Sequence, residues 1–235
     1  MKKRFLAFTL AETLIVIGVI GIVSALTLPN LNSSTGEKEK VAKVKKIYQN
    51  LQDAFGRAEA VYGPYDEWIK TTDTTQELKA KRIGERITEF LKVSKNCNTT
   101  TGSGCFNSGQ YKKISGDNYE SADTTDYYKV ITADGTSVAI KNNVIVVDID
   151  GPTKGKFTLG HDIFWFGSNS NVGVVPYNND DFGTLLTEVT TRGTQASGWI
   201  IKYDNADYLQ FQSVSGSTAT CKNGNTVTET NPRCK

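Results

Sequence analysis

One carboxylate inside an apolar segment constrains this chain more than any other sequence feature. The segment runs from Phe8 to Leu28, follows the basic residues Lys2, Lys3 and Arg4, and contains the single acid Glu12. About 20 apolar residues cross a bilayer, so residues 8–28 are predicted to form a transmembrane helix. A carboxylate at the centre of such a helix costs roughly 2.5–3.5 kcal/mol. We therefore expect Glu12 to have a cationic partner and a function.

Three interpretations of this N-terminus compete. A basic start before an apolar run is typical of a secretory signal peptide, and Val23-Ser24-Ala25 is an acceptable cleavage site for one. The run is also long enough for an ordinary membrane anchor. The third interpretation is a class III leader, in which a short basic peptide is removed before the apolar run. Neither a signal peptide nor an ordinary anchor explains a carboxylate at Glu12, so the class III leader is favoured.

The sequence AFTLAETLIV, residues 7–16, resembles the prepilin cleavage and methylation motif of type IV pilins and type II secretion pseudopilins. The resemblance covers only residues 1–30. It implies that residues 1–7 are a leader peptide, that prepilin peptidase cleaves between Ala7 and Phe8, and that Phe8 is then methylated. Ala7 stands where the family usually has glycine, a departure expected to slow cleavage. Ala11 and Thr13 likewise replace larger apolar residues.

The same resemblance implies roles for Glu12 and Pro29. Glu12, fifth after the cut, would dock subunits by pairing with the N-terminal amine of a neighbour, and Pro29 would kink the helix. An α-amino group has a pKa of about 7.7–8, so the new amine of Phe8 is a cation near neutral pH. It lies about one helical turn from Glu12, so pairing within one chain is an alternative. A third possibility is that Glu12 reaches a lipid headgroup.

The charge of the chain does not indicate nucleic-acid binding, because 27 Lys and Arg residues face 25 Asp and Glu residues. The basic leader fits the positive-inside rule. We therefore predict a single-pass inner-membrane protein with its C-terminal domain outside the cytoplasm. The resemblance implies that it later enters a cell-surface or periplasmic filament. Lysines cluster again over residues 38–46, which are expected to be solvated or to contact anionic lipid before assembly.

The four cysteines are predicted to form disulfides. They allow three connectivities, and short loop closure favours the local pairs Cys97–Cys105 and Cys221–Cys234. Zinc is the alternative, but neither pair has the spacing of zinc ligands, and His161 is the only histidine. The pilin resemblance also implies a disulfide loop near the C-terminus.

Hydrophobic periodicity divides the remaining chain. After the span at 8–28, residues 29–63 are predicted to hold the kink and an amphipathic helix that ends at Gly63-Pro64, and residues 64–235 a globular domain. The expected apolar stripe of that helix is Val41, Val44, Tyr48, Leu51, Phe55, Ala58 and Tyr62. A second amphipathic helix is expected over 76–93, with Leu78, Ile83, Ile87 and Leu91 on one side.

Beyond these helices, the hydrophobic periodicity changes from about 3.6 residues, typical of helices, to 2 residues, typical of strands. Residues 127–133 and 136–141, joined by Asp134-Gly135, predict a hairpin, and residues 144–148 a third strand. Residues 162–166 and 172–175 are expected to be further strands, while 199–203 is ambiguous between strand and helix. The predicted fold class is α+β: a long N-terminal helix, half membrane span and half amphipathic, packed on an antiparallel sheet domain of pilin type.

Three further patterns are candidate sites. Asp148 and Asp150 alternate before Gly151, and Asp162 follows a glycine-rich excursion, which resembles a calcium loop. The bidentate glutamate of an EF-hand is missing, and Asp-Gly-Pro is also ordinary turn chemistry, so both interpretations stay open. A catalytic centre is not expected, because no nucleophile motif accompanies the lone His161. The aromatic residues Phe164, Trp165, Phe166 and Trp199 favour core positions over a binding groove.

These observations predict a prepilin-like structural subunit of a type IV pilus, not an enzyme, without a required cofactor. Its expected partners are prepilin peptidase, an inner-membrane assembly platform, the membrane before assembly, and other pilin-like subunits in a homo- or heteropolymer. A type II secretion pseudopilin is the alternative within the family. A membrane-tethered binding protein that never polymerises is the alternative outside it.

Overall fold

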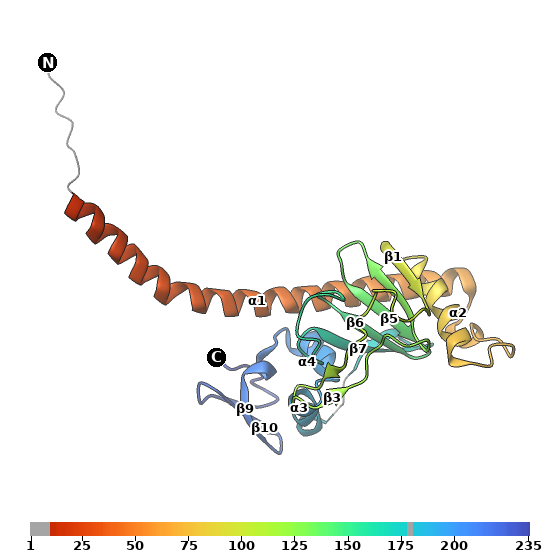
Figure 1. The fold of residues 1–235 in the computed structure, drawn as a ribbon. Helices are drawn as coiled ribbons and strands as arrows, with labels where there is room; N and C mark the ends of the chain where they lie inside the picture. Colours follow the sequence, from red (N-terminus) through yellow and green to blue (C-terminus); the bar gives the residue numbers. More distant parts are fainter. Residues whose placement is uncertain (1–9, 178–180) are drawn as a thin grey trace. The chain divides into compact units, whose positions relative to one another are not determined.

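The computed structural model describes residues 10–177 and 181–235, except for the side chains of residues 24–35. The chain divides into two compact units, residues 1–39 and residues 40–235. Helix α1 (Leu10–Tyr62) contributes to both units, and every other described element belongs to the second (Figure 1). Pro29 lies within α1, at a position whose side chain is not described, so the predicted kink stays a prediction.

The predicted transmembrane helix over 8–28 is wrong. Within the described ranges, no helix is long and apolar enough to cross a membrane. Of the predicted span, only residues 10–23 have described side chains, which is fewer than the roughly 20 apolar residues that a bilayer requires. We therefore correct the predicted fold class, which combined a membrane-spanning half-helix with a pilin-type sheet domain. The predicted single-pass location in the inner membrane is corrected for the same reason.

The part of α1 in the second unit is amphipathic, as its sequence period predicts. Its buried side chains lie on one face of the helix: Val41, Val44, Ile47, Leu51, Ala54, Phe55 and Ala58. Two of them, Ile47 and Ala54, were not part of the predicted stripe. Tyr48 is half-buried and stacks on Phe166 with 5.8 Å between ring centroids. The helix ends at Tyr62 because Gly63 adopts a φ of +81°, which favours glycine.

The centre of the second unit is a six-stranded antiparallel sheet in the order β1-β4-β5-β6-β7-β8. The strands are β1 (Val93–Asn98), β4 (Tyr128–Thr132), β5 (Ser137–Lys141), β6 (Val144–Asp148), β7 (Ile163–Asn169) and β8 (Gly173–Pro176). The predicted hairpin over 127–141 and the third strand over 144–148 are confirmed. A two-stranded ribbon, β2 (Tyr111–Lys112) with β3 (Asn118–Tyr119), was not predicted.

The two faces of the sheet bury different clusters. Phe164 and Phe166 on β7 pack with α1 in the larger core, whereas Trp165 between them points to the other face. The smaller cluster on that second face includes Ala139, Val146 and Ile163. Figure 1 shows the part of α1 in the second unit, residues 40–62, running along the sheet. The alternation of strand side chains therefore gives the domain two separate packing layers.

Helix α2 (Gln76–Thr88) is shorter than the helix predicted over 76–93, because the chain enters β1 at Val93. It packs closely on β4: a Cβ added to Gly84 would lie 2.2 Å from Cγ of Tyr128. Ile83 and Ile87 are buried, but Leu78, predicted on the same face, is 43% exposed. Only a glycine at position 84 allows this approach of helix to sheet.

The C-terminal part adds helices and a small second sheet. It comprises α3 (Phe182–Thr191), α4 (Ala196–Tyr203), η2 (Asp207–Gln210), β9 (Phe211–Ser215), β10 (Thr218–Cys221) and β11 (Thr226–Val227). A further short helix, η1 (Tyr65–Glu67), lies between α1 and α2. The ambiguous segment 199–203 is helical. Trp199 is fully buried and contacts the rings of Phe182 and Phe211, which joins α3, α4 and β9.

Candidate functional site

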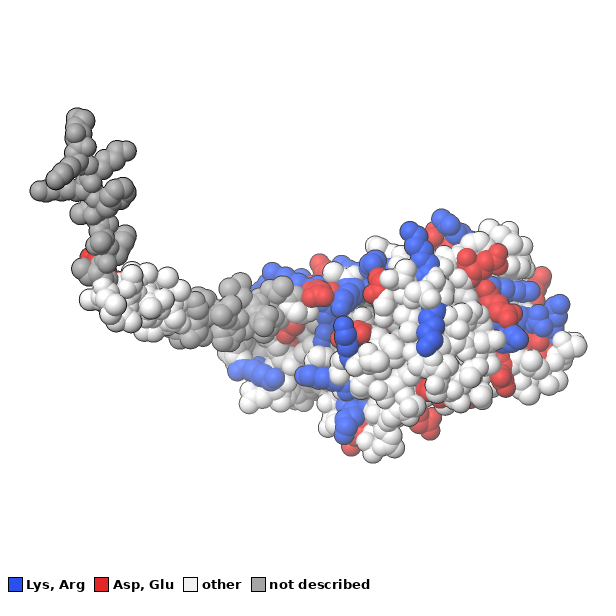
Figure 2. All heavy atoms as spheres, turned by 45° about the horizontal axis from the view of Figure 1, so that its top comes forward, with Lys and Arg blue, Asp and Glu red and all other residues white. Residues whose placement is uncertain are grey.

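The described N-terminal stretch of α1, residues 10–23, is uncovered apolar surface, and we call it the apolar stretch. Its large hydrophobic side chains are between 54% and 79% exposed: Leu10, Leu14, Ile15, Val16, Ile17, Val19, Ile20, Ile22 and Val23. They occur on all sides of the helix, and this stretch is almost entirely white in Figure 2. Exposed apolar surface of this kind marks an interaction site rather than a solvated helix.

Glu12 lies in the first turn of α1 and is exposed. A carboxylate there is stabilised by the positive end of the helix dipole, by about 0.3–1 kcal/mol. Beside it, Thr13 donates its hydroxyl to the carbonyl of Leu10 at 2.9 Å. Gly18 and Gly21 have no atom within 4 Å of an added Cβ, so a second helix could approach closely there.

The predicted processing site lies outside the described residues. Ala7 and Phe8 belong to residues 1–9, so cleavage between them and methylation of Phe8 stay predictions. The docking role of Glu12 also stays a prediction.

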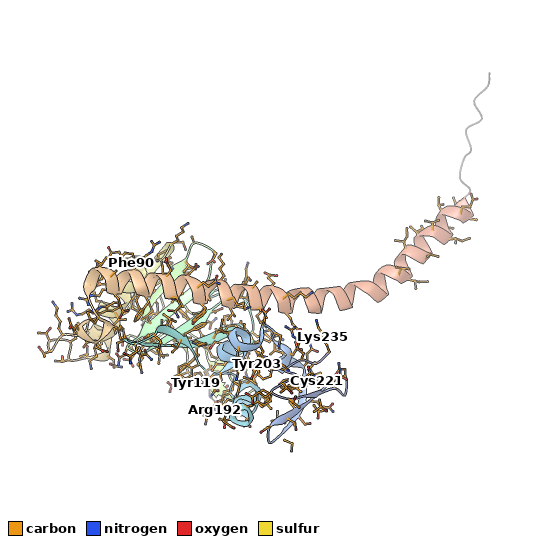
Figure 3. The ribbon with its side chains drawn as sticks, turned by 180° about the vertical axis from the view of Figure 1, so that it is seen from behind. Phe90, Tyr119, Arg192, Tyr203, Cys221 and Lys235 are labelled. Carbon is orange, nitrogen blue, oxygen red and sulfur yellow. A yellow bond between two sulfur atoms is a disulfide. The ribbon has the colours of Figure 1, made fainter. Side chains whose placement is uncertain are left out.

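Both predicted disulfides are present, with the local connectivity that loop closure favoured. Cys97 pairs with Cys105 and Cys221 with Cys234, at Cα–Cα distances of 6.2 Å and 5.7 Å. Cys221 lies at the end of β10, near the C-terminal Lys235 (Figure 3). The amide of Cys234 donates to the carboxylate of Asp207 at 2.7 Å. The second disulfide therefore fixes the end of the chain against η2 and β10.

Replacing both Cys221 and Cys234 by alanine should lower the free energy of unfolding by about 3 kcal/mol, because their loop of roughly 15 residues would be free in the unfolded chain. Urea unfolding of the full chain measures the loss. Wild-type protein treated with a reductant should lose at least as much, because the reductant also opens Cys97–Cys105. A change of less than 1 kcal/mol in the double variant would contradict the prediction.

Two of the three candidate calcium ligands, Asp148 and Asp162, act in the structure as turn-forming carboxylates, whereas Asp150 pairs with Lys43. Asp162 accepts the backbone N–H groups of residues 156, 157 and 158 at 2.5, 2.6 and 2.8 Å. Asp148 accepts those of Asp150 and Gly151 at 3.1 and 3.0 Å. Among the described residues, no group of three His, Cys, Asp or Glu could hold a metal ion. Calcium binding stays a prediction, and the turn chemistry is observed.

Burial changes the charge of this acidic corner, which we define as Asp148, Asp150 and Asp162. Burial and, to a smaller extent, the neighbouring acids Asp150 and Asp162 raise the pKa of Asp148 to about 8, against the effect of its two backbone hydrogen bonds. Burial also raises the pKa of Asp162, although its three backbone donors lower it. Asp148 is thus protonated near neutral pH, and its Oδ2 has no hydrogen-bond partner.

The lysines of α1 pair with the domain. Lys43, Lys45 and Lys46 contact Asp150, Asp204 and Asp134 at 3.1, 2.6 and 2.7 Å. The ammonium of Lys40 lies 3.0 Å from Nδ1 of His161. Burial and the nearby lysines lower the pKa of His161 to about 4, so the ring is neutral and accepts from Lys40. Each exposed pair contributes about 0–1 kcal/mol. These four lysines therefore serve the fold, while their contact with anionic lipid before assembly stays a prediction.

A buried ion pair near the first disulfide had no sequence signal. Nζ of Lys129 lies 3.8 Å from Oδ1 of Asp123, and both side chains are buried. Lys129 also donates to the carbonyl of Thr99 at 3.3 Å, and Asp123 accepts the amide of Gly102 at 2.9 Å. Burial lowers the pKa of Lys129. Thr99 and Gly102 lie inside the Cys97–Cys105 loop, so this pair holds that loop on β4.

Electrostatically, the domain surface seen in Figure 2 carries interspersed acidic and basic side chains. The apolar stretch is thus the surface of the described chain that deviates most from a solvated protein. Comparison of the chain with models of known families, with characterised proteins and with solved structures found no match.

Proposed function

We propose that this chain is a prepilin-like structural subunit that polymerises through the apolar stretch of α1. The observation that supports the proposal is the exposure of its hydrophobic side chains on all sides of the helix. Covering such surface is strongly favourable, at about 25 cal/mol per Å² removed from water. The same stretch of other subunits is the simplest cover, since a helix apolar on all sides can be surrounded by equivalent helices.

The sequence supplies the processing that such assembly requires. Prepilin peptidase removes residues 1–7 and the new terminus at Phe8 is methylated, as the resemblance of residues 7–16 implies. The carboxylate of Glu12 then pairs with the amine of Phe8 on a neighbouring subunit. A carboxylate buried among apolar helices without that cation would be strongly unfavourable, so the pair selects one stagger between subunits. The secretion pseudopilin alternative would use the same surface and the same pair.

Glu12→Ala should leave cleavage unchanged and reduce recovery of the subunit in sheared filaments about tenfold or more. A tenfold change corresponds to about 1.4 kcal/mol, less than the usual cost of an unpaired buried charge. The matched control is Thr13→Ala, which changes the neighbouring residue without changing charge and should polymerise normally. Intact mass checks processing in each case. Equal recovery of Glu12→Ala and wild type would remove the pairing argument.

The mass measurement also tests the proposal as a whole. A mature chain that begins at methylated Phe8 supports the filament subunit. A mature N-terminus at Leu26, beyond the signal-peptide site at residues 23–25, would refute it, because the apolar stretch would be absent.

A further inference from the structure

A cavity of about 270 Å³ lies on the second face of the sheet, away from α1. Strand register places Ala139, Val146 and Trp165 in one row across β5, β6 and β7, so their side chains share this face. Val146 and Trp165 form the floor of the cavity. The β2–β3 ribbon and the segment leading into β4 provide its walls. Small-molecule sites usually measure about 300–1,000 Å³, so this one suits a single small ring.

The cavity is lined by aromatic rings that stay half-exposed. Trp165 makes edge contacts with Tyr119 and Tyr177, both with 5.8 Å between ring centroids. Tyr127 lines the same cavity, and burial raises its pKa to about 12, so its hydroxyl is neutral. The neighbouring residues Phe164 and Phe166 are fully buried in the core, whereas Trp165 between them is only partly buried. Trp165 is therefore the aromatic residue of this strand that a ligand could contact.

One buried hydroxyl at the cavity is without a partner. Tyr111, on β2, is 1% exposed, lines the cavity, and among the described residues its hydroxyl has no partner with hydrogen-bond geometry. The Ser121 hydroxyl and the backbone of Asn107 both lie near enough to lower the pKa of Tyr111, but the Ser121 hydroxyl donates to the carbonyl of Asn107. Burial raises the pKa of Tyr111, which keeps the phenol as a donor. Buried polar groups are normally paired, so this hydroxyl is available to a ligand.

The rim charges favour a neutral ligand. Lys141 lies over the Tyr127 ring at 5.3 Å from its centroid and 2.8 Å from the carboxylate of Asp126. A cationic ligand would meet this ammonium, which already occupies the face of Tyr127. An anionic ligand would meet Asp126 and Glu120, which both line the cavity. A neutral polyhydroxylated ring can instead place its C–H face on the aromatic rings and its hydroxyls on these donors and acceptors.

We propose that this cavity binds a monosaccharide unit of a glycan. Trp165 and Tyr119 contact the apolar face of the sugar ring, and Tyr111 donates a hydrogen bond to one of its oxygens. The proposal is independent of polymerisation, because every residue involved belongs to the domain 40–235.

The test uses the full chain and a panel of methyl glucoside, methyl galactoside and N-acetylglucosamine, measured by saturation-transfer NMR and titration. Choline, a cation, and acetate, an anion, are tested in parallel as charged ligands. At least one sugar should bind, and Trp165→Ala should weaken that binding about tenfold or more, as truncation of an aromatic anchor does. Tyr111→Phe should weaken it several-fold while the melting temperature stays equal or rises, because the lost hydroxyl has no partner in the free protein.

The matched control is Phe90→Ala, which removes another half-buried aromatic ring at a different cavity. Phe90 and Tyr119 lie well apart on the domain (Figure 3), so sugar binding should not change. The proposal is overturned if no sugar of the panel binds, if choline or acetate binds at Trp165 in preference to them, or if Tyr111→Phe and Trp165→Ala both bind like wild type.

Discussion

The full chain carrying Asp148→Asn should be more stable than wild type at pH 8, by on the order of 5 kcal/mol, and equally stable at pH 3. Asp148 is fully buried, and burial raises its pKa from the ordinary 3.8 to about 8. Each pKa unit corresponds to about 1.4 kcal/mol. Asparagine keeps the oxygen that accepts the amides of Asp150 and Gly151, but it has no proton to lose.

The direction follows from proton binding in the two states. Well below pH 3.8, Asp148 is protonated in both the folded and the unfolded chain, so it adds no pH dependence. Between about pH 3.8 and 8 the carboxyl is ionised in the unfolded chain but still protonated in the folded one, so the free energy of unfolding of wild type falls as pH rises. Above pH 8 both states are ionised and the difference is constant.

Urea unfolding across this range measures the effect. Asp150→Asn is the matched control: Asp150 is partly exposed and paired with Lys43, so its substitution should change stability by no more than about 1 kcal/mol. Parallel pH profiles for wild type and Asp148→Asn would show that Asp148 is ionised in the folded protein and would contradict the prediction.

Phe55→Ala should lower the free energy of unfolding by about 3–5 kcal/mol, the range for truncating a buried phenylalanine. Phe55 is 1% exposed and lies between the rings of Tyr65 and Trp68, at 5.2 and 5.5 Å between centroids. Its loss would leave a cavity where α1 meets the segment that follows it.

Arg57→Ala on the exposed side of the same helix is the matched control. Within the described part of the chain, Arg57 pairs only with Asp53 one turn away. Both side chains are more than half exposed, so the loss of Arg57 should cost less than about 0.5 kcal/mol. Chemical denaturation of the full chain measures both variants. Similar losses for the two would mean that this end of α1 does not anchor the domain.

Local patterns in the sequence predicted the elements whose evidence is local. The stripe of residues 41–58 and the hairpin around Asp134-Gly135 depend on periods of 3.6 and 2 and on one turn, all readable within a short window. The end of α2 was missed because it depends on the pairing of β1 with β4, and these are distant in sequence. The helix over 199–203 depends on the burial of Trp199, which no local pattern shows.

The candidate sites also divide into those that local sequence patterns could predict and those that depend on contacts between distant residues. The disulfide pairing followed from short loops, so sequence separation sufficed. The assignment of Asp162 to turn formation required knowing which amides surround it, and the exposure of Trp165 between two buried phenylalanines required knowing what covers each face. The membrane span failed because apolar length alone does not establish a spanning helix.

The lysine pairs of α1 have one more consequence. Their partners Asp134, Asp150 and His161 stand at the end of β4, after β6 and before β7, which in an antiparallel sheet is the same end of the strands. If α1 slid by one turn, about 5.4 Å, every lysine would face the wrong neighbour. Weak pairs that add little to stability thus fix one register of the domain part of α1, residues 40–62, on the sheet.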